Sequence, residues 1–304
     1  MENLQTIELE FLRTLRDLSS PIIDAITEFI TMFGEQYIMV FLLIVIYFAY
    51  NKIFGKKLAY IIFSSLCLNG SVKGIVQRTR PFVVDPSLDS VRKETATGFS
   101  FPSGHTQNSS TIYLGIAYNN TWKKRVVWII AITLSILIAL SRLVLAVHYP
   151  TDVLVGFIFG TICAIGLSFI YNKYAKDLNK ETILFLITFI LFLPFCFIFY
   201  KKTYADIYIY KNFYTAYAMF GGFIIGNFLE GKFVNFNNET TLLKKIFRLI
   251  GAVVLYIIIN FGLKAILPSE NIFCDIFRYF MITFVIIGIY PIIFKNLLFK
   301  KNEI

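Results

Sequence analysis

The stretch SRLVLAVHYPTD, from Ser141 to Asp152, lies between two long apolar runs of the sequence. It carries an arginine, an aspartate and one of the two histidines in the 304-residue chain. Charged groups at membrane depth are expensive, about 2.5 to 3.5 kcal/mol for an arginine at a helix centre on insertion scales, and they usually mark function. The stretch therefore predicts a turn between two membrane helices that carries a functional site.

The composition of the whole chain agrees with a membrane location. Hydrophobic residues make up 57% of the chain and charged residues 16%, whereas soluble domains contain about 45 to 50% apolar residues. Apolar runs of about 20 residues, the length that a bilayer demands of a helix, recur along the sequence. We therefore expect an all-α fold, a polytopic transmembrane helix bundle. A soluble protein with a large core would not need apolar runs of this length.

The net charge of +10 raises the alternative of nucleic-acid binding. The basic residues are spread among short segments between apolar runs and are not gathered on one amphipathic element. The charge therefore predicts membrane topology and no nucleic-acid partner. The four cysteines fall in or beside apolar segments without metal-ligand spacing. We expect them to be small buried hydrophobic side chains.

The apolar runs divide the chain into three parts. Residues 1–34 are expected to form amphipathic or interfacial helices, residues 35–172 a catalytic membrane core, and residues 173–304 additional transmembrane helices. The predicted membrane spans are 35–50, 57–76, 103–119, 126–147, 152–172, 181–200, 213–230, 246–267 and 274–298.

The distribution of Lys and Arg predicts the orientation, because short cytoplasmic loops collect these residues. It favours an N-terminus outside the cytoplasm, which places the loop at 77–102 and the turn at 148–151 on the same outer face. Richness in Ile, Lys, Asn, Phe and Tyr is typical of an AT-rich bacterial genome. We expect a multi-pass protein of the bacterial inner membrane with an extracytoplasmic active site.

Two basic residues mark the outer end of the second span. Lys73 and Arg80 are seven residues apart, which is two helical turns, so both cations are expected on one face of this helix. Pro81 is expected to end the helix, because the residue before a proline avoids helical geometry. Taken alone, the pair is more typical of interfacial cations whose long side chains reach toward water.

The segment FPSGHTQNS contains a second group of candidates. Pro102, Ser103 and Gly104 are expected to begin a helix whose first backbone N–H groups are free to hold an anion. His105 falls in the first turn of this helix. Taken alone, the segment is equally typical of an ordinary helix start with an incidental histidine.

The third group is in the opening stretch. Arg142 ends the fourth span, His148 lies in the turn, and Asp152 occupies the first turn of the fifth span. An aspartate four residues after a histidine can accept a hydrogen bond from one ring nitrogen and leave the other nitrogen free to attack. The alternative is an aspartate that favours the helix dipole beside an interfacial histidine. That alternative leaves Arg142 unexplained.

Together these residues fit one chemical need. Three cations, a helix N-terminus and a serine hydroxyl can hold three phosphoryl oxygens, while two histidines take different roles in phosphoryl transfer. The sequence has no nearby carboxylate cluster for Mg²⁺ or Ca²⁺ and no Gly-rich loop with Lys-Ser/Thr for a nucleotide. We expect a reaction through a phosphohistidine with no metal and no cofactor.

The three segments resemble the motifs of a known family. KGIVQRTRP from Lys73, PSGH from Pro102 and SRLVLAVHYPTD from Ser141 are similar, in order and internal spacing, to the motifs of the type 2 phosphatidic acid phosphatase superfamily. This superfamily includes lipid phosphate phosphatases and related lipid phosphotransferases. The resemblance covers residues 35–172. One departure is Ala146, where the family often has glycine, and this alanine is expected to crowd the turn slightly.

The resemblance implies a role for each matching residue. His148 would be the nucleophile, Asp152 would orient it, and His105 would protonate the leaving oxygen and then activate water. The phosphate would be bound by Lys73, Arg80, Ser103, the backbone N–H of Gly104, and Arg142. Because these roles need His148 neutral and His105 protonated in one complex, activity is expected to show a bell-shaped pH dependence.

Three functions are compatible with these residues. The first is a membrane phosphatase that removes a terminal phosphate from an amphiphilic lipid, such as an isoprenoid phosphate or diphosphate, phosphatidic acid or phosphatidylglycerol phosphate. The second is a lipid phosphotransferase that uses the same phosphohistidine. The third is a lipid-binding or transport protein, which would need the cations but not a paired nucleophile and acid. The expected partners are the lipid substrate and the bilayer.

Two glycine pairs predict close helix packing. Gly156 and Gly160 form a small-residue stripe that would let the fifth span approach its neighbour. Gly222 and Gly226 have the GxxxG spacing, which serves either a homodimer interface or packing within the chain. We favour packing within the chain, because this spacing is common in membrane helices.

Overall fold

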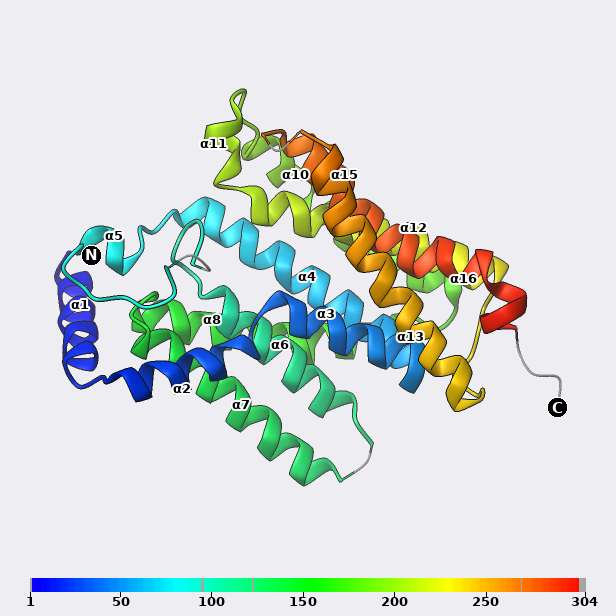
Figure 1. The fold of residues 1–304 in the computed structure, drawn as a ribbon, viewed down its shortest axis with the longest axis horizontal. Coiled ribbons are helices and arrows are strands. Elements are labelled where there is room, and N and C mark those ends of the chain that lie inside the picture. Colours follow the sequence, from blue (N-terminus) through cyan, green and yellow to red (C-terminus); the bar gives the residue numbers. More distant parts are fainter. Residues whose placement is uncertain (1, 94–95, 122, 269, 301–304) are drawn as a thin grey trace. The chain divides into compact units, whose positions relative to one another are not determined.

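A computed structural model describes residues 2–93, 96–121, 123–268 and 270–300. Every regular element in these ranges is a helix (Figure 1). The chain divides into two compact units: residues 1–39 with 68–168, and residues 40–67 with 169–304. We call them unit 1 and unit 2. The predicted all-α helical fold is confirmed.

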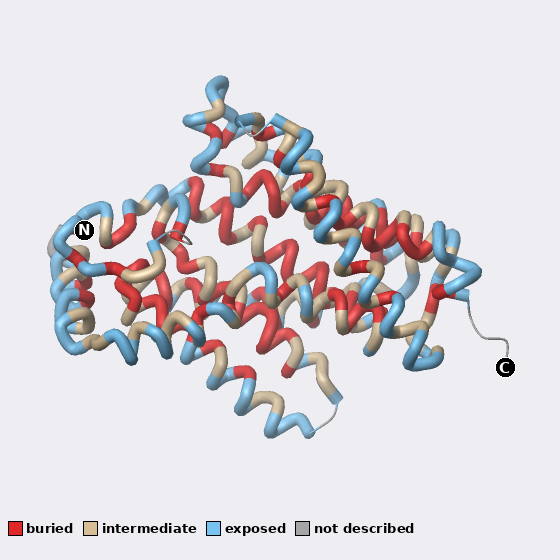
Figure 2. Tube along the Cα trace, in the orientation of Figure 1, coloured by how far each residue is buried: buried red, intermediate tan, exposed pale blue. Residues whose placement is uncertain are grey.

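Unit 1 contains the three motif segments. Its helices are α1 (Glu2–Asp17), α2 (Pro21–Met32), the first residues of α3 (Gln36–Val45), the end of α4 (Lys52–Val76), α5 (Pro81–Val84), α6 (Gly104–Asn119), α7 (Lys124–Val144) and α8 (Pro150–Ile162). Helix α8 continues through a π-helical turn, η3 (Cys163–Leu167), into α9 (Ser168–Tyr174). Within unit 1, α6 packs against both α7 and α8, and most of its residues are buried (Figure 2).

The glycines of α8 make its contact with α6 close. A Cβ added at Gly156 would lie 2.7 Å from the carbonyl oxygen of Ser103, and one added at Gly160 would lie 2.5 Å from the carbonyl oxygen of Gln107. Real Cβ atoms essentially never approach other atoms this closely. The predicted close packing of this glycine stripe is confirmed, and it fixes the start of α6 against the start of α8.

Unit 2 contains the remaining helices. They are the end of α3 with its π-helical turn η1 (Ile46–Tyr50), the start of α4, α10 (Leu178–Ile198), α11 (Tyr204–Tyr208), α12 (Lys211–Phe233), α13 (Leu242–Ile257), η4 (Ile258–Gly262), α14 (Leu263–Ile266), α15 (Ile272–Phe284), η5 (Val285–Ile289), α16 (Tyr290–Ile293) and η6 (Lys295–Phe299). Added Cβ atoms would lie 2.3 Å from Phe280 O at Gly222 and 3.1 Å from Gly288 N at Gly226. The GxxxG pair therefore packs α12 within the chain, as favoured.

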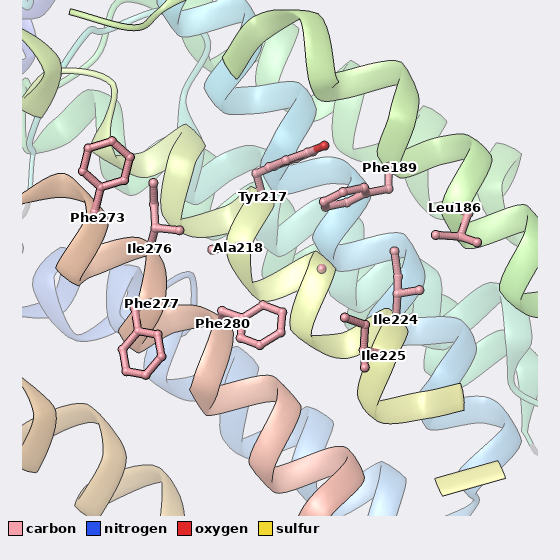
Figure 3. A pocket seen from close by; sticks show the side chains of 11 residues that line it. Leu186, Phe189, Tyr217, Ala218, Ile224, Ile225, Phe273, Ile276, Phe277 and Phe280 are labelled. Carbon is pink, nitrogen blue, oxygen red and sulfur yellow. The ribbon is translucent and has the colours of Figure 1, made fainter. Parts of the chain in front are cut away.

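Unit 2 also contains buried ion pairs and an apolar groove. Buried ion pairs join Lys52 to Glu230 at 3.0 Å and Lys56 to Glu181 at 2.7 Å. Helices α10, α12 and α15 also line an apolar groove of about 440 Å³, in which aromatic rings such as Phe189 lie beside aliphatic side chains (Figure 3).

The nine predicted membrane spans coincide with helices to within a few residues. Within the described ranges, six helices are long and apolar enough to cross a bilayer alone. The pair Pro21–Met32 and Gln36–Tyr50 passes only as one segment bent by 41°. Helices α6 and α12 do not pass. Both are largely enclosed by other helices, so many of their side chains meet protein instead of lipid.

Candidate active site

The first motif reaches the site by a turn and not along one helix face. Helix α4 ends at Val76, Gln77 adopts a left-handed conformation with φ of 52°, and Arg80 precedes the first residue of α5. The prediction that one helix carries both cations, and that Pro81 ends it, is therefore wrong. Lys73 and Arg80 nevertheless meet the same loop. Lys73 Nζ donates to Phe99 O at 2.6 Å, and Arg80 Nε donates to Gly98 O at 2.9 Å.

The second motif forms the start of α6. Ser103 is fully buried, its backbone N–H donates to Asp152 O at 2.9 Å, and its hydroxyl accepts from Thr106 Oγ1 at 3.0 Å. The Ser103 side chain makes no capping bond to the helix, so it does not occupy the N–H groups of the first turn, which begins at Gly104. His105 follows, and its Nε2 atom is buried without a hydrogen-bond partner in the part of the chain that the structure describes.

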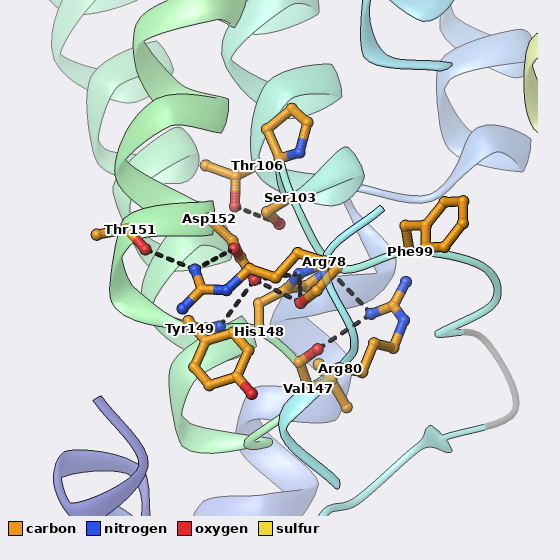
Figure 4. Close-up of polar contacts among 12 residues, drawn as sticks. Arg78, Arg80, Phe99, Ser103, Thr106, Val147, His148, Tyr149, Thr151 and Asp152 are labelled. Carbon is orange, nitrogen blue, oxygen red and sulfur yellow. Dashed lines mark hydrogen bonds and ion pairs between the residues drawn. The ribbon is translucent and has the colours of Figure 1, made fainter. Parts of the chain in front are cut away.

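The third motif places His148 between an acid and a cation (Figure 4). Its Nδ1 lies 3.4 Å from Asp152 Oδ2, and its Nε2 lies 3.2 Å from Arg80 Nη1. A guanidinium can only donate, so Nε2 must accept with its lone pair and the ring proton belongs on Nδ1, facing Asp152. This is the tautomer in which Nε2 can act as a nucleophile.

The Asp152 carboxylate is held at both oxygens. Oδ2 accepts from Tyr149 N at 3.0 Å and from Ser100 Oγ at 2.5 Å, and Oδ1 accepts from Arg78 Nη1 at 2.8 Å. Sequence analysis did not select Arg78 or Ser100. Arg78 lies inside the basic stretch of the first motif, so a third cation was visible there, but its carboxylate partner was not. Ser100 carries no charge or spacing that would have marked it.

Arg142 is fully buried with only part of its guanidinium paired. Its Nη1 donates to Thr31 Oγ1 at 2.7 Å, while Nε and Nη2 have no hydrogen-bond partner among the described residues. Its charge acts on both histidines, which lie within electrostatic range of it. Unpaired buried donors are costly, so these two atoms are candidates to donate to an anionic group. Thr31, on α2, is another residue that the sequence did not single out.

Burial and the nearby cations both lower the pKa of His148. Burial lowers the pKa of the His148 imidazole well below its ordinary value of 6.5, and the charges of Arg80, Lys73 and Arg142 lower it further. Both effects favour the neutral form of the His148 ring. A neutral ring is what attack on a phosphorus atom requires.

Ala146 is the residue that departs from the family pattern. It adopts a left-handed conformation with φ of 53° and is fully buried against Leu12 and Tyr149. Only glycine adopts this conformation without steric cost. The alanine is thus accommodated at some strain in the turn that presents His148.

Comparisons with known proteins agree with these motifs. The PAP2 superfamily model matches residues 54–177, and the model for the transmembrane extension of PAP2 superfamily phosphatases matches residues 214–302. Phosphatidylglycerophosphatase B of Bacillus subtilis (strain 168) is 31% identical over 156 residues, which cover 48% of this chain and 73% of that protein. The chain belongs to the PAP2 superfamily.

Two other PAP2 relatives extend the comparison. Undecaprenyl-diphosphatase of Sulfolobus acidocaldarius is 28% identical over 137 residues, covering 44% of this chain and 63% of that protein. The crystal structure of a transmembrane PAP2 type phosphatidylglycerolphosphate phosphatase from Bacillus subtilis aligns with a TM-score of 0.50 at 24% identity. The alignment covers 57% of this chain and 88% of that structure, and it shows a shared fold. The chain is thus a multi-pass membrane phosphatase of the PAP2 superfamily, as the sequence predicted.

Proposed function

We propose that this PAP2 phosphatase hydrolyses a phosphomonoester or diphosphate of an amphiphilic lipid through a phosphohistidine at His148. One observation carries the proposal: the His148 ring has Nδ1 directed at Asp152 and Nε2 directed at Arg80. A ring that served only to bind phosphate would not need a carboxylate on its far side. A ring that attacks phosphorus does, because the imidazolium that forms must be stabilised.

The proposed reaction has two steps. In the first, Nε2 of His148 bonds to phosphorus, the bond from phosphorus to the lipid oxygen breaks, and His105 gives its proton to that oxygen. In the second, His105 takes a proton from water, the hydroxide attacks phosphorus, and the phosphorus–nitrogen bond breaks to release inorganic phosphate. Asp152 holds the Nδ1 proton of the positively charged ring during both steps.

The phosphate would be held by Lys73, Arg80, Ser103, the Gly104 N–H and Arg142. Lys73 and Arg80 now donate to backbone carbonyl oxygens of the loop at 97–100. Anionic phosphoryl oxygens are stronger acceptors than carbonyls, so a phosphate can replace these bonds. The unpaired Nε and Nη2 atoms of Arg142 would gain partners at the same time. These observations support phosphate binding at this point of unit 1.

The proposed substrates are isoprenoid phosphates or diphosphates, phosphatidic acid and phosphatidylglycerol phosphate. Two relatives support this range, since one is named for a phosphorylated glycerolipid and the other for an isoprenoid diphosphate. We assign catalysis to residues 35–172, interfacial helices to residues 1–34 and additional membrane helices to residues 173–304. The proposed location is the bacterial inner membrane with the active site on the extracytoplasmic side.

The test is a panel of these lipid phosphates, assayed in detergent with a chelator present. Wild-type protein should release phosphate from at least one lipid and should incorporate labelled phosphate in an acid-labile form. His148→Ala should do neither. Full phosphate release by His148→Ala would overturn the proposal. Transfer of label to a second lipid, in place of free phosphate, would instead favour the phosphotransferase function.

A further inference from the structure

Helix α1 contacts the catalytic turn along one face. Gln5 Nε2 donates to Tyr149 OH at 3.0 Å, Leu12 is fully buried against Tyr149, and Arg16 Nη1 donates to Val144 O at 3.2 Å. These residues follow one another at intervals of seven and four, so they lie on one side of the helix. Helix α1 therefore supports the turn between α7 and α8, in addition to lying at the surface.

Glu8 is on the same face and is buried, which is unusual for a carboxylate in a surface helix. Its Oε1 accepts from Thr151 N at 2.8 Å and from Thr151 Oγ1 at 2.7 Å. Its Oε2 accepts from Arg78 Nη2. Thr151 N is one of the first backbone N–H groups of α8, where a helix favours negative charge. Glu8 thus caps the helix that carries Asp152, although it comes from a distant part of the chain.

Arg78 connects Glu8 to Asp152. While Nη2 faces Glu8, Nη1 donates to Asp152 Oδ1 at 2.8 Å and to Thr151 Oγ1 at 2.7 Å. The guanidinium lies over the Tyr149 ring, with its central carbon 3.7 Å from the ring centroid, which limits its movement. Because Arg78 holds Oδ1, the carboxylate cannot turn, and Oδ2 stays directed at His148.

We propose that Glu8 and Arg78 are positioning residues for the reaction, and that α1 is thereby a working part of the active site. The proposal rests on the proposed phosphohistidine function. Glu8 orients Arg78 by an ion pair, Arg78 fixes the rotation of the Asp152 carboxylate, and Asp152 aims Nε2 of His148 at phosphorus. The side chains of Glu8 and Arg78 hydrogen-bond to Thr151, Asp152 and each other, whereas the cations that would bind phosphate hydrogen-bond to the loop at 97–100 and to Thr31.

This arrangement predicts that Glu8 affects the rate of the chemical step and not the binding of phosphate. Loss of Glu8 should slow the attack by His148 but leave phosphate binding intact. Outer partners that orient metal-ligating side chains are worth about 10-fold to 100-fold in activity, and we expect a similar factor for Glu8, which orients a reacting group in the same way. A residue that merely stabilised the fold would instead lower the amount of active protein, with kcat per active site unchanged.

The experiment compares three variants of the full chain in detergent. Glu8→Ala removes the carboxylate. Glu8→Gln keeps the shape and an acceptor for Thr151 but removes the charge that orients Arg78. Glu10→Ala is the matched control, since Glu10 is an exposed glutamate on the same helix. For each variant, kcat, KM, the inhibition constant of inorganic phosphate and the thermal unfolding temperature are measured. Active sites are counted by trapping the phosphohistidine.

Glu8→Ala should lower kcat about 10-fold to 100-fold, with KM and the phosphate inhibition constant unchanged. Glu8→Gln should also lower kcat, by a smaller factor, and it decides the result if Glu8→Ala does not fold. Glu10→Ala should match the wild type. Wild-type kcat in Glu8→Gln, or parallel losses of kcat and phosphate binding, would overturn the proposal. An active His148→Ala variant would instead mean that the proposed function itself has failed.

Discussion

Replacing Gly156 with alanine tests whether the contact between α8 and α6 sets the active-site geometry. The new Cβ would lie 2.7 Å from Ser103 O and 3.4 Å from Ser103 N. Ordinary contact begins at 3.4 Å, so the two helices must separate locally by about the difference, 0.7 Å. Overpacking of this kind typically costs about 1 to 3 kcal/mol of stability. Because Ser103 N also donates to Asp152 O, the shift would move the phosphate-binding turn relative to the nucleophile.

The loss of activity should exceed the loss of stability. A misplacement of about 1 Å can reduce the rate about 100-fold, so a shift of 0.7 Å should lower kcat/KM at least tenfold. Gly166→Ala is the matched control, because a Cβ there meets nothing within 4 Å. It should retain full activity and gain about 0.5 to 1 kcal/mol, as alanine usually does over glycine in a helix. Thermal unfolding and lipid phosphatase assays in detergent give both values. Equal unfolding temperatures and equal kcat/KM for the two variants would refute the reasoning.

Three more outcomes are expected. Burial and the neighbouring cations lower the pKa of His148, and the attacking ring must be neutral, so the acid limb of the kcat/KM profile should lie well below pH 6.5. The profile is measured with two substrates whose phosphates titrate differently, so that titration of the substrate is recognised. An acid limb at or above pH 6.5 with both substrates would contradict this. Thr31→Val removes the acceptor of Arg142 Nη1 and should raise KM about tenfold, since a hydrogen bond from a charged donor contributes about 1.5 kcal/mol or more. An unchanged KM would show that Thr31 does not orient Arg142. Lys52→Met should cost about 3 to 5 kcal/mol of stability by leaving Glu230 buried and unpaired, and adding Glu230→Leu should recover most of this loss. Unfolding in denaturant measures the stability of the single and the double variant. Losses that simply add would show that the ion pair between Lys52 and Glu230 does not stabilise the fold.

The positions of the membrane helices could be predicted because apolar runs of bilayer length are a strong signal. Helices α6 and α12 could be predicted as helices but do not pass a hydropathy test alone, because other helices largely enclose them. On α6, Gln107 and Ser110 are buried among protein. A helix that meets other helices can carry polar side chains that lipid would not tolerate.

The three segments that form the site could also be identified, because each has a local spacing that chemistry constrains. The geometry behind one of them was misjudged. Lys73 and Arg80 approach the same loop because the chain leaves the helix after Val76, whereas the prediction used the period of a continuous helix. A left-handed residue such as Gln77 has no sequence signal strong enough to reveal that turn.

The residues that hold the Asp152 carboxylate could not be predicted from the sequence, for a different reason. Arg78 and Asp152 are 74 residues apart in the sequence, and Arg78 and Glu8 are 70 apart, so neither pair has a spacing that indicates contact. Along α1, the amphipathic pattern predicted one apolar face toward the membrane surface. The structure has such a face, with Leu4 and Ile7 exposed, and a second face on which Glu8 meets the catalytic turn. Under the role proposed for Glu8, the 1–34 segment contributes to the enzyme's chemistry through this second face.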